Sequence, residues 1–192
     1  MVTDTKTALL DSAERAARSR GFDGFSYADL SNDVGIRKAS IHYHFPTKAD
    51  LALALMQRYR LNFQNVCEQI EKTEQSGARR LEAVIGNYRD ALNGGNTLCL
   101  CVSLSASRDS LPAGVIDEIQ AFRQEMITWL CRAFQIAKED DSIVGIYHPQ
   151  AEAAAALSLF EGAHLAARAE ENPDLFEKAI WLLQHRIKTP SQ

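Results

Sequence analysis

Hydrophobic residues recur at steps of three and four along almost the whole chain, which is the spacing of one face of an α-helix. Sustained alternation of apolar and polar residues, the pattern of a half-buried strand, does not occur over any long stretch. Clusters of Gly, Pro, Asn and Asp divide the pattern into about nine segments. The sequence therefore predicts an all-α fold of about nine helices.

The predicted helices are short and closely spaced near the N-terminus and longer in the rest of the chain. This difference predicts two domains, a three-helix unit over residues 1–50 and a larger helical domain over residues 51–192. The expected helices of the larger domain cover about residues 78–92, 96–107, 112–138, 150–170 and 174–188, after a fourth helix that begins near residue 47.

Punctuation residues define the three N-terminal helices. The first is expected over about residues 4–19 and stops at Gly21, since glycine tolerates the positive φ of a helix C-terminus. Ser26 and Asp29 have the spacing of a capping box for the second helix, which Gly35 ends. The third helix, over residues 37–45, follows at once. Two short helices joined at a tight glycine turn form a helix-turn-helix, whose second helix enters a DNA major groove.

The third helix has the composition of a recognition helix. Ile41 and Phe45 lie four residues apart as buried anchors, and the other side chains are mostly hydrogen-bond donors. Between Arg37 and Lys48 there are three cationic side chains, two histidines and no carboxylate. These donors suit phosphates and base edges. The predicted DNA-contacting residues are Ser26, Tyr27, Arg37, Lys38, Ala39, Ser40, His42, Tyr43, His44 and Lys48.

The start of the fourth helix gives an independent indication of an anion. Thr47 and Asp50 form a second capping-box pattern, yet Lys48 places a cation in the first helical turn. The helix macrodipole disfavours that cation by a few tenths of a kcal/mol. A DNA phosphate bound by the helix N-terminus and by Lys48 would relieve this repulsion.

The run from Gly35 to Leu51, preceded by Gly21-Phe22 and by Ser26 to Leu30, resembles the DNA-binding domain of the TetR family of one-component transcriptional regulators. The resemblance covers about residues 5–55. It implies a homodimeric repressor whose third helix reads the operator and whose C-terminal domain binds a small-molecule effector that releases it from DNA. Arg37 stands where the family more often has a capping Ser or Thr, and Ser31 where a small apolar residue is usual.

Composition and charge agree with a globular regulator. Hydrophobic residues make up 46% of the 192 residues and charged residues 24%. The formal net charge of −4 argues against a surface that is basic throughout, so basic character is local. Four cysteines without a CxxC pair favour a reducing cytoplasm, and we expect no signal peptide, membrane segment, metal site or cofactor. Common catalytic motifs are absent, so we expect no enzyme.

Apolar and aromatic residues of the larger domain suggest an effector pocket, a position that the family resemblance also implies. The pocket candidates are Tyr88, Cys101, Phe122, Met126, Trp129 and Phe160, although such a stripe is also typical of plain core. Cys99 and Cys101 point about 200° apart on a helix, which disfavours a direct disulfide. A thiol-responsive redox regulator is the sharper alternative to two buried cysteines.

The last two predicted helices carry small residues and Leu on one face, and the resemblance implies that they form a four-helix-bundle dimer interface. The interface candidates are Ala154, Leu157, Ser158, Glu161, Leu165, Phe176, Ile180, Leu183 and Ile187. A helical ligand-carrier or interaction module that binds no DNA is the other alternative, and it leaves the basic segment from Arg37 to Lys48 unexplained.

Overall fold

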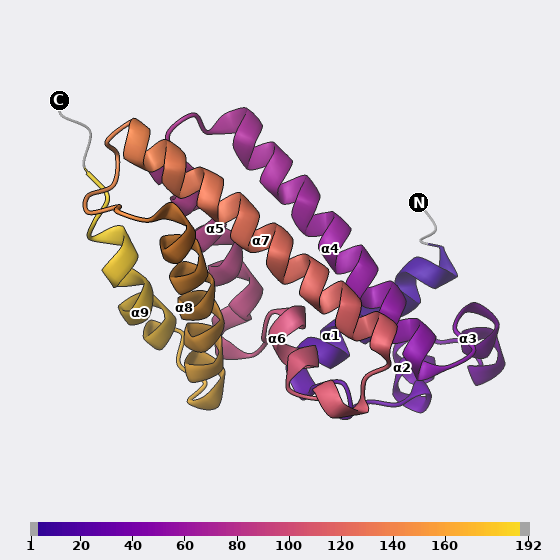
Figure 1. Ribbon diagram of the computed structural model, residues 1–192. Helices are drawn as coiled ribbons and strands as arrows, with labels where there is room; N and C mark the ends of the chain where they lie inside the picture. Colours follow the sequence, from indigo (N-terminus) through magenta and orange to yellow (C-terminus); the bar gives the residue numbers. More distant parts are fainter. Residues whose placement is uncertain (1–3, 189–192) are drawn as a thin grey trace. The chain divides into compact units, whose positions relative to one another are not determined.

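The computed structural model describes residues 4–188, which form nine α-helices and two short 3-10 helices (Figure 1). The all-α prediction is confirmed. The helices are α1 (Thr5–Arg20), α2 (Tyr27–Val34), α3 (Lys38–His44), α4 (Lys48–Thr73), α5 (Gly77–Leu92), η1 (Asn93–Gly95), α6 (Leu100–Ser105), η2 (Arg108–Ser110), α7 (Ala113–Glu139), α8 (Pro149–Ala169) and α9 (Asp174–Gln184).

Two of the predicted helices are shorter than expected. The expected helix over residues 96–107 is reduced to α6, because Asn93, Gly94 and Gly95 all take positive φ and the chain turns before it can continue as a helix. The last helix ends at Gln184 rather than residue 188. There the backbone pairs instead with the loop before α8: the Val144 amide donates to the Arg186 carbonyl at 2.9 Å, and the Lys188 amide donates to the Ser142 carbonyl at 2.9 Å.

The packing divides the chain into two compact units. The first contains the chain up to Asn62 together with Leu100–Phe122, and the second contains Phe63–Cys99 together with the chain from Arg123 onward. Both α4 and α7 therefore contribute one part to each unit. The predicted domain boundary at residue 50 stays a prediction.

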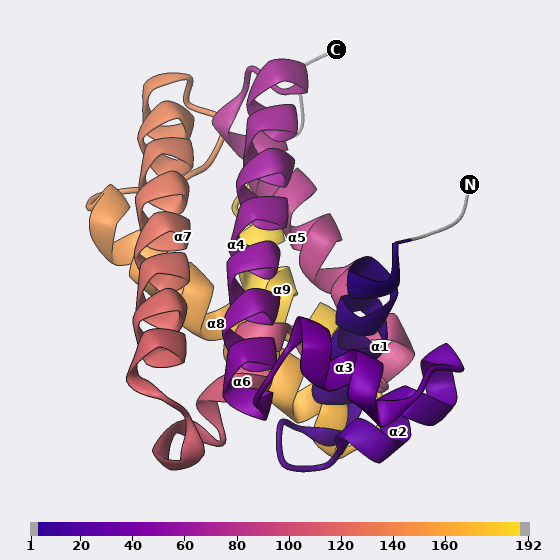
Figure 2. The same ribbon diagram turned by 90° about the vertical axis from the view of Figure 1, so that its right-hand side faces the viewer.

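In the first unit, α1, α2 and α3 gather around one apolar core (Figure 2). Leu9 of α1, Leu30 of α2 and Ile41 of α3 are each at most 1% exposed. The predicted capping box of α2 forms, with the Ser26 amide donating to the Asp29 carboxylate at 2.7 Å. Gly35 ends α2 with a φ of 73°, which glycine adopts without steric cost. Local signals in the sequence thus define the helix-turn-helix.

Polar contacts attach α1 to other helices of the first unit. The Arg58 guanidinium of α4 donates to Asp11 at 2.6 Å and to Glu14 at 2.7 Å. The buried Ser103 hydroxyl of α6 donates to the Ala17 carbonyl at 2.6 Å. Helix α1 is therefore attached to α6 and to the part of α4 that belongs to this unit.

The Lys48 ammonium fixes the loop between α1 and α2. It donates to the Phe22 carbonyl at 2.5 Å and to the Phe25 carbonyl at 2.7 Å. It also lies 4.5 Å and 4.4 Å from the centroids of the Phe22 and Phe25 rings, within cation–π range. Burial lowers the pKa of Lys48 from its ordinary value, the effect expected when an ammonium loses part of its hydration.

In the second unit, α8 and α9 pack against each other and against α5. Phe160 and Phe176 are fully buried in this core. Helix α5 begins where the chain approaches α7 most closely. A Cβ at Gly77 would lie 2.2 Å from the Ala137 backbone nitrogen, so only glycine fits there. The Gly77 amide donates to the Asp140 carboxylate at 2.9 Å, which caps the helix from outside.

We predict that replacing Lys48 by Met lowers the free energy of unfolding by about 1.5–3 kcal/mol, because two carbonyls lose a charged donor while the apolar stem is kept. Chemical denaturation of the purified variant measures this change. Lys38→Met, at an exposed lysine of α3, is the matched control and should stay within about 0.5 kcal/mol of the parent. Equal stability of the two variants would contradict the assigned contacts.

Candidate nucleic-acid interface

Helix α3 turns one face into the first unit and the opposite face to solvent. Ile41 is fully buried, and Phe45 just after the helix is 2% exposed. Because each residue of an α-helix turns by about 100°, Ala39 and Tyr43 point away from Ile41 and Ser40 and His42 flank them. The Tyr43 side chain is 84% exposed. The anchors therefore determine which side chains a DNA groove would meet.

A hollow lies beside this outward face. It is lined by Thr5, Ile36, Ala39, Ser40, Tyr43 and His44. The Tyr43 and His44 rings meet edge to face with centroids 5.2 Å apart. Residues from α1, from the turn and from α3 thus contribute to one surface.

Two cations stand at the start of α3. Arg37 and Lys38 are exposed, and neither takes part in an ion pair with any residue of the described range 4–188. Exposed and unneutralised cations suit DNA phosphates, whose attraction for Lys and Arg is strong and depends on salt.

His42 has one ring nitrogen committed to the protein. Its Nδ1 lies 3.1 Å from the Pro46 carbonyl oxygen, and because a carbonyl only accepts, Nδ1 carries the proton. The ring also packs edge to face on Tyr27, with centroids 5.0 Å apart. In the neutral imidazole, Nε2 is therefore an acceptor on a ring that is held in place.

The polar atoms of Ser26 and Tyr27 act within the protein. Ser26 caps α2, and the Tyr27 hydroxyl donates to the Phe45 carbonyl at 2.9 Å. Burial, and then the negative charge of Asp50, raises the pKa of Tyr27 to about 12. In this structure the two residues join the start of α2 to the end of α3.

Lys48 is oriented differently from the prediction. The sequence suggested an ammonium directed at an external anion, whereas the ammonium points to the Phe22 and Phe25 carbonyls. Those two acceptors and the two phenyl rings stabilise the cation that the helix macrodipole disfavours. The predicted capping box next to it does form, with the Thr47 amide donating to Asp50 at 2.9 Å.

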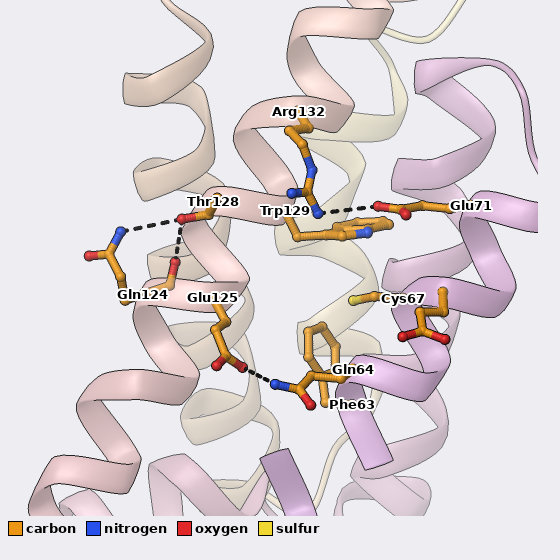
Figure 3. Close-up of a pocket in the computed structure, with 10 residues that line it drawn as sticks. Phe63, Gln64, Cys67, Glu71, Gln124, Glu125, Thr128, Trp129 and Arg132 are labelled. Carbon is orange, nitrogen blue, oxygen red and sulfur yellow. Dashed lines mark hydrogen bonds and ion pairs between the residues drawn. The ribbon is translucent and has the colours of Figure 1, made fainter. Parts of the chain in front are cut away.

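The predicted pocket residues are mostly packed in the interior of the protein, and their role in effector binding stays a prediction. Tyr88 and Phe160 pack on each other with ring centroids 4.8 Å apart, and Phe122 packs on Tyr59 at 5.3 Å. Cys101 and Met126 are fully buried. Trp129 lines a cavity between α4 and α7 in the second unit (Figure 3).

The predicted interface residues fall into two groups, one buried in the core of the chain and one at its surface. Leu157, Phe176, Ile180 and Leu183 are at most 7% exposed, so they are core residues of the chain itself and not available to a partner. Ala154, Ser158 and Leu165 are exposed, Glu161 pairs with Arg123, and Ile187 is half-buried. Periodicity identified the apolar stripe of α9 but not that α8 covers it, and it missed the exposed Trp181 and Leu182.

The thiols do not form an accessible pair. Cys99 is 1% exposed and Cys101 is fully buried. Within residues 4–188, no group of three or more His, Cys, Asp or Glu side chains has the arrangement of a metal site. In the same range, no helix is both long and apolar enough to cross a bilayer.

The N-terminal segment matches a known family. Residues 9–55 match the family described as bacterial regulatory proteins, tetR family. The chain is 36% identical over 76 residues to the HTH-type transcriptional regulator CymR of Pseudomonas putida, covering 40% of this chain and 33% of CymR. It is 34% identical over 53 residues to TtgR of Pseudomonas putida, covering 28% of this chain and 25% of TtgR. These matches thus span a quarter to a third of the curated relatives.

Solved structures extend the likeness over the full chain. A TetR-family transcriptional regulator from Agrobacterium tumefaciens is 29% identical, with a TM-score of 0.89 over 96% of this chain and 97% of that one. A TetR transcriptional regulator from Legionella pneumophila is 25% identical, with a TM-score of 0.86 over 97% of this chain and 99% of that one. Residues 9–55 thus match the DNA-binding segment of the tetR family of bacterial regulatory proteins, and the chain as a whole has the helical fold of solved TetR-family regulators.

Proposed function

We propose that this protein is a cytoplasmic, homodimeric transcriptional repressor that binds a palindromic operator and is released by a small-molecule effector. The observation that carries the proposal is the outward face of α3. Donor side chains are exposed there on a helix whose opposite side is locked by Ile41 and Phe45. Such a helix enters a major groove as a rigid unit.

We assign the side chains of this face by their position. Ser40 and His42 suit base edges, and the small Ala39 allows the helix to approach the groove closely. Arg37, Lys38 and Tyr43 suit phosphates, with His44 beside them. Ser26, Tyr27 and Lys48 act as positioning residues, because their polar atoms are used within the domain.

We assign the dimer interface to the outer surface of α8 and α9. Small residues are exposed along α8 at Ala154, Ala155, Ser158, Gly162 and Ala166. Trp181 and Leu182 of α9 are 57% and 59% exposed. Small side chains let helices approach closely, and the two exposed apolar side chains provide apolar surface that a partner would bury. Both features suit a two-fold interface formed by α8 and α9 of each subunit.

Release by an effector would depend on the spacing of the two α3 helices in the dimer. Two recognition helices of a dimer fit successive major grooves only when they are about 34–36 Å apart. A ligand that favours another spacing weakens operator binding, with a coupling free energy of typically about 1–3 kcal/mol.

We expect binding-site selection from a random duplex library to enrich a palindrome. The two-fold axis of a dimer must match a two-fold axis in the DNA, which is the physical reason for the symmetry. Sequencing of the retained duplexes measures the enrichment. Native mass spectrometry of the input protein excludes a co-purified ligand. Ligand-free protein that enriches no symmetric motif would contradict the proposal.

We predict that Lys38→Ala weakens binding to every sequence and lowers the slope of log affinity against log salt by about one, because one phosphate contact is lost. Fluorescence anisotropy at several salt concentrations measures the slope. Lys72→Ala, at an exposed lysine of α4 outside the helix-turn-helix and outside α8 and α9, is the control and should keep the parental slope. A parental slope for Lys38→Ala would refute this phosphate assignment, and a lowered slope for Lys48→Met would return Lys48 to the DNA-contacting set.

We predict that Trp181→Glu raises the dimer dissociation constant by at least about thirtyfold, because a charge would be buried where an aromatic side chain packs. Analytical ultracentrifugation measures the constant, and circular dichroism checks that the helices are kept. Tyr147→Glu replaces an aromatic residue that is 80% exposed outside α8 and α9, and it should dimerise like the parent. A monomeric parent at micromolar concentration would argue against the dimer.

A further inference from the structure

His42 is an exposed residue of α3 whose ring is held by two neighbours. Its Nδ1 lies 3.1 Å from the Pro46 carbonyl oxygen. The ring also packs edge to face on the Tyr27 ring, with centroids 5.0 Å apart. The first contact fixes which edge of the imidazole faces the protein, and the second restrains its plane. The imidazole therefore has a defined orientation on the surface of the first unit.

Tyr27, which supports this ring, is itself held in place. Its hydroxyl donates to the Phe45 carbonyl at 2.9 Å. Burial, and then the negative charge of Asp50, raises the pKa of Tyr27 to about 12, so the hydroxyl keeps its proton and this hydrogen bond at neutral pH. Phe45 is 2% exposed. The residue that anchors α3 in the core thus also anchors the side chain on which His42 packs.

The Pro46 contact decides which nitrogen of His42 carries the proton. A carbonyl oxygen accepts hydrogen bonds and does not donate them, so the donor in the neutral imidazole is Nδ1–H. Nε2 then has no proton and acts only as an acceptor. No residue of the described range 4–188 donates a hydrogen bond to Nε2. This acceptor is therefore available to a donor outside the protein.

An atom that only accepts discriminates between the bases in a major groove. The exocyclic amino groups of adenine and cytosine are donors there, whereas guanine and thymine present the acceptors N7, O6 and O4. Phosphate oxygens are acceptors as well. Other polar side chains of α3 lack this selectivity, because the Lys38 ammonium only donates and the hydroxyls of Ser40 and Tyr43 can donate or accept. Nε2 of His42 is complementary only to a base that carries an amino group.

We infer that His42 specifies one operator position by accepting a hydrogen bond, through Nε2, from the exocyclic amino group of an adenine or a cytosine. It selects these two bases against guanine and thymine once in each half-site. Tyr27 is a positioning residue, because it contacts the imidazole ring and holds it in place. The inference rests on the proposed operator binding and names the chemical class of base that this side chain recognises.

Binding-site selection with the parent and with His42→Phe locates the operator position. Phenylalanine keeps a ring against Tyr27 and has no nitrogen, and the selections are run above neutral pH, where an imidazole is ordinarily neutral. We expect His42→Phe to lose the preference for adenine or cytosine at one pair of symmetry-related positions and to keep it elsewhere. Lys38→Ala changes an exposed cation of the same helix and should keep the parental preference at every position.

Base analogues then test the amino group without changing the protein. At the located position of one half-site, a nebularine nucleotide replaces adenine or a zebularine nucleotide replaces cytosine, and both analogues lack the exocyclic amino group. Fluorescence anisotropy measures the affinity for each duplex. We expect the parent to bind the analogue duplex about fivefold more weakly, which corresponds to the loss of one neutral hydrogen bond. The analogue also weakens its own base pair, so the loss measured with His42→Phe, which should be small, is subtracted.

Three results would overturn the inference while leaving operator binding intact. They are an unchanged base preference in His42→Phe, a guanine or thymine at the position that this variant alters, and an equal loss of affinity for the analogue duplex in both proteins. A parent that enriches no motif contradicts the proposed function itself, so the two failures are distinct.

Circular dichroism checks that His42→Phe keeps its helices. If it does not, the analogues are placed in turn at every adenine and cytosine of the enriched motif and titrated with the parent alone. One symmetry-related pair of sensitive positions is the expected result, and a motif without any sensitive amino group would overturn the inference.

Discussion

Burial of Ile41 and Phe45 inside the first unit is the constraint on which the outward face of α3 depends. Helix α3 has only seven residues, too few to be stable alone, so its orientation comes from these two side chains. Once both are inside, helical geometry places Ala39, Ser40, His42 and Tyr43 outside. Rotating the helix to turn these four side chains away from solvent would expose the two buried anchors.

Polar residues around α3 reinforce this orientation from within. Tyr27 binds the carbonyl that follows the helix, Ser26 caps its neighbour, and Lys48 holds the loop before that neighbour. A hydrogen-bond donor close to α3 in the sequence is therefore not necessarily a DNA contact, because some of these donors bind acceptors within the domain. The Lys48 ammonium has two carbonyls and two phenyl rings as partners and stabilises the domain. Lys38 is exposed, has no ion-pair partner among the described residues and is available to a phosphate.

The two parts of α4 and α7 have different chemistry. In the first unit, Arg60 of α4 forms an ion pair with Glu118 of α7 at 2.7 Å, so the two helices are joined there by opposite charges. In the second unit the facing residues include three carboxylates and a buried indole whose Nε1 has no hydrogen-bond partner within residues 4–188. Members of the tetR family are DNA-binding regulators rather than enzymes, which agrees with the expectation drawn from the absent catalytic motifs.

The sequence by itself determined the helical class and the helix-turn-helix, because these depend on local signals: the apolar period, the Ser26–Asp29 capping box and the glycine at position 35. Only the tertiary structure decided how distant residues combine. Phe176 and Trp181 lie on one short helix, yet α8 covers the first and leaves the second exposed. Glu125 and Trp129 face Phe63 and Cys67 only because α4 and α7 pack together. The periodicity of the sequence shows which face of a helix is apolar and which is polar. Only the packing of the helices decides what each face contacts.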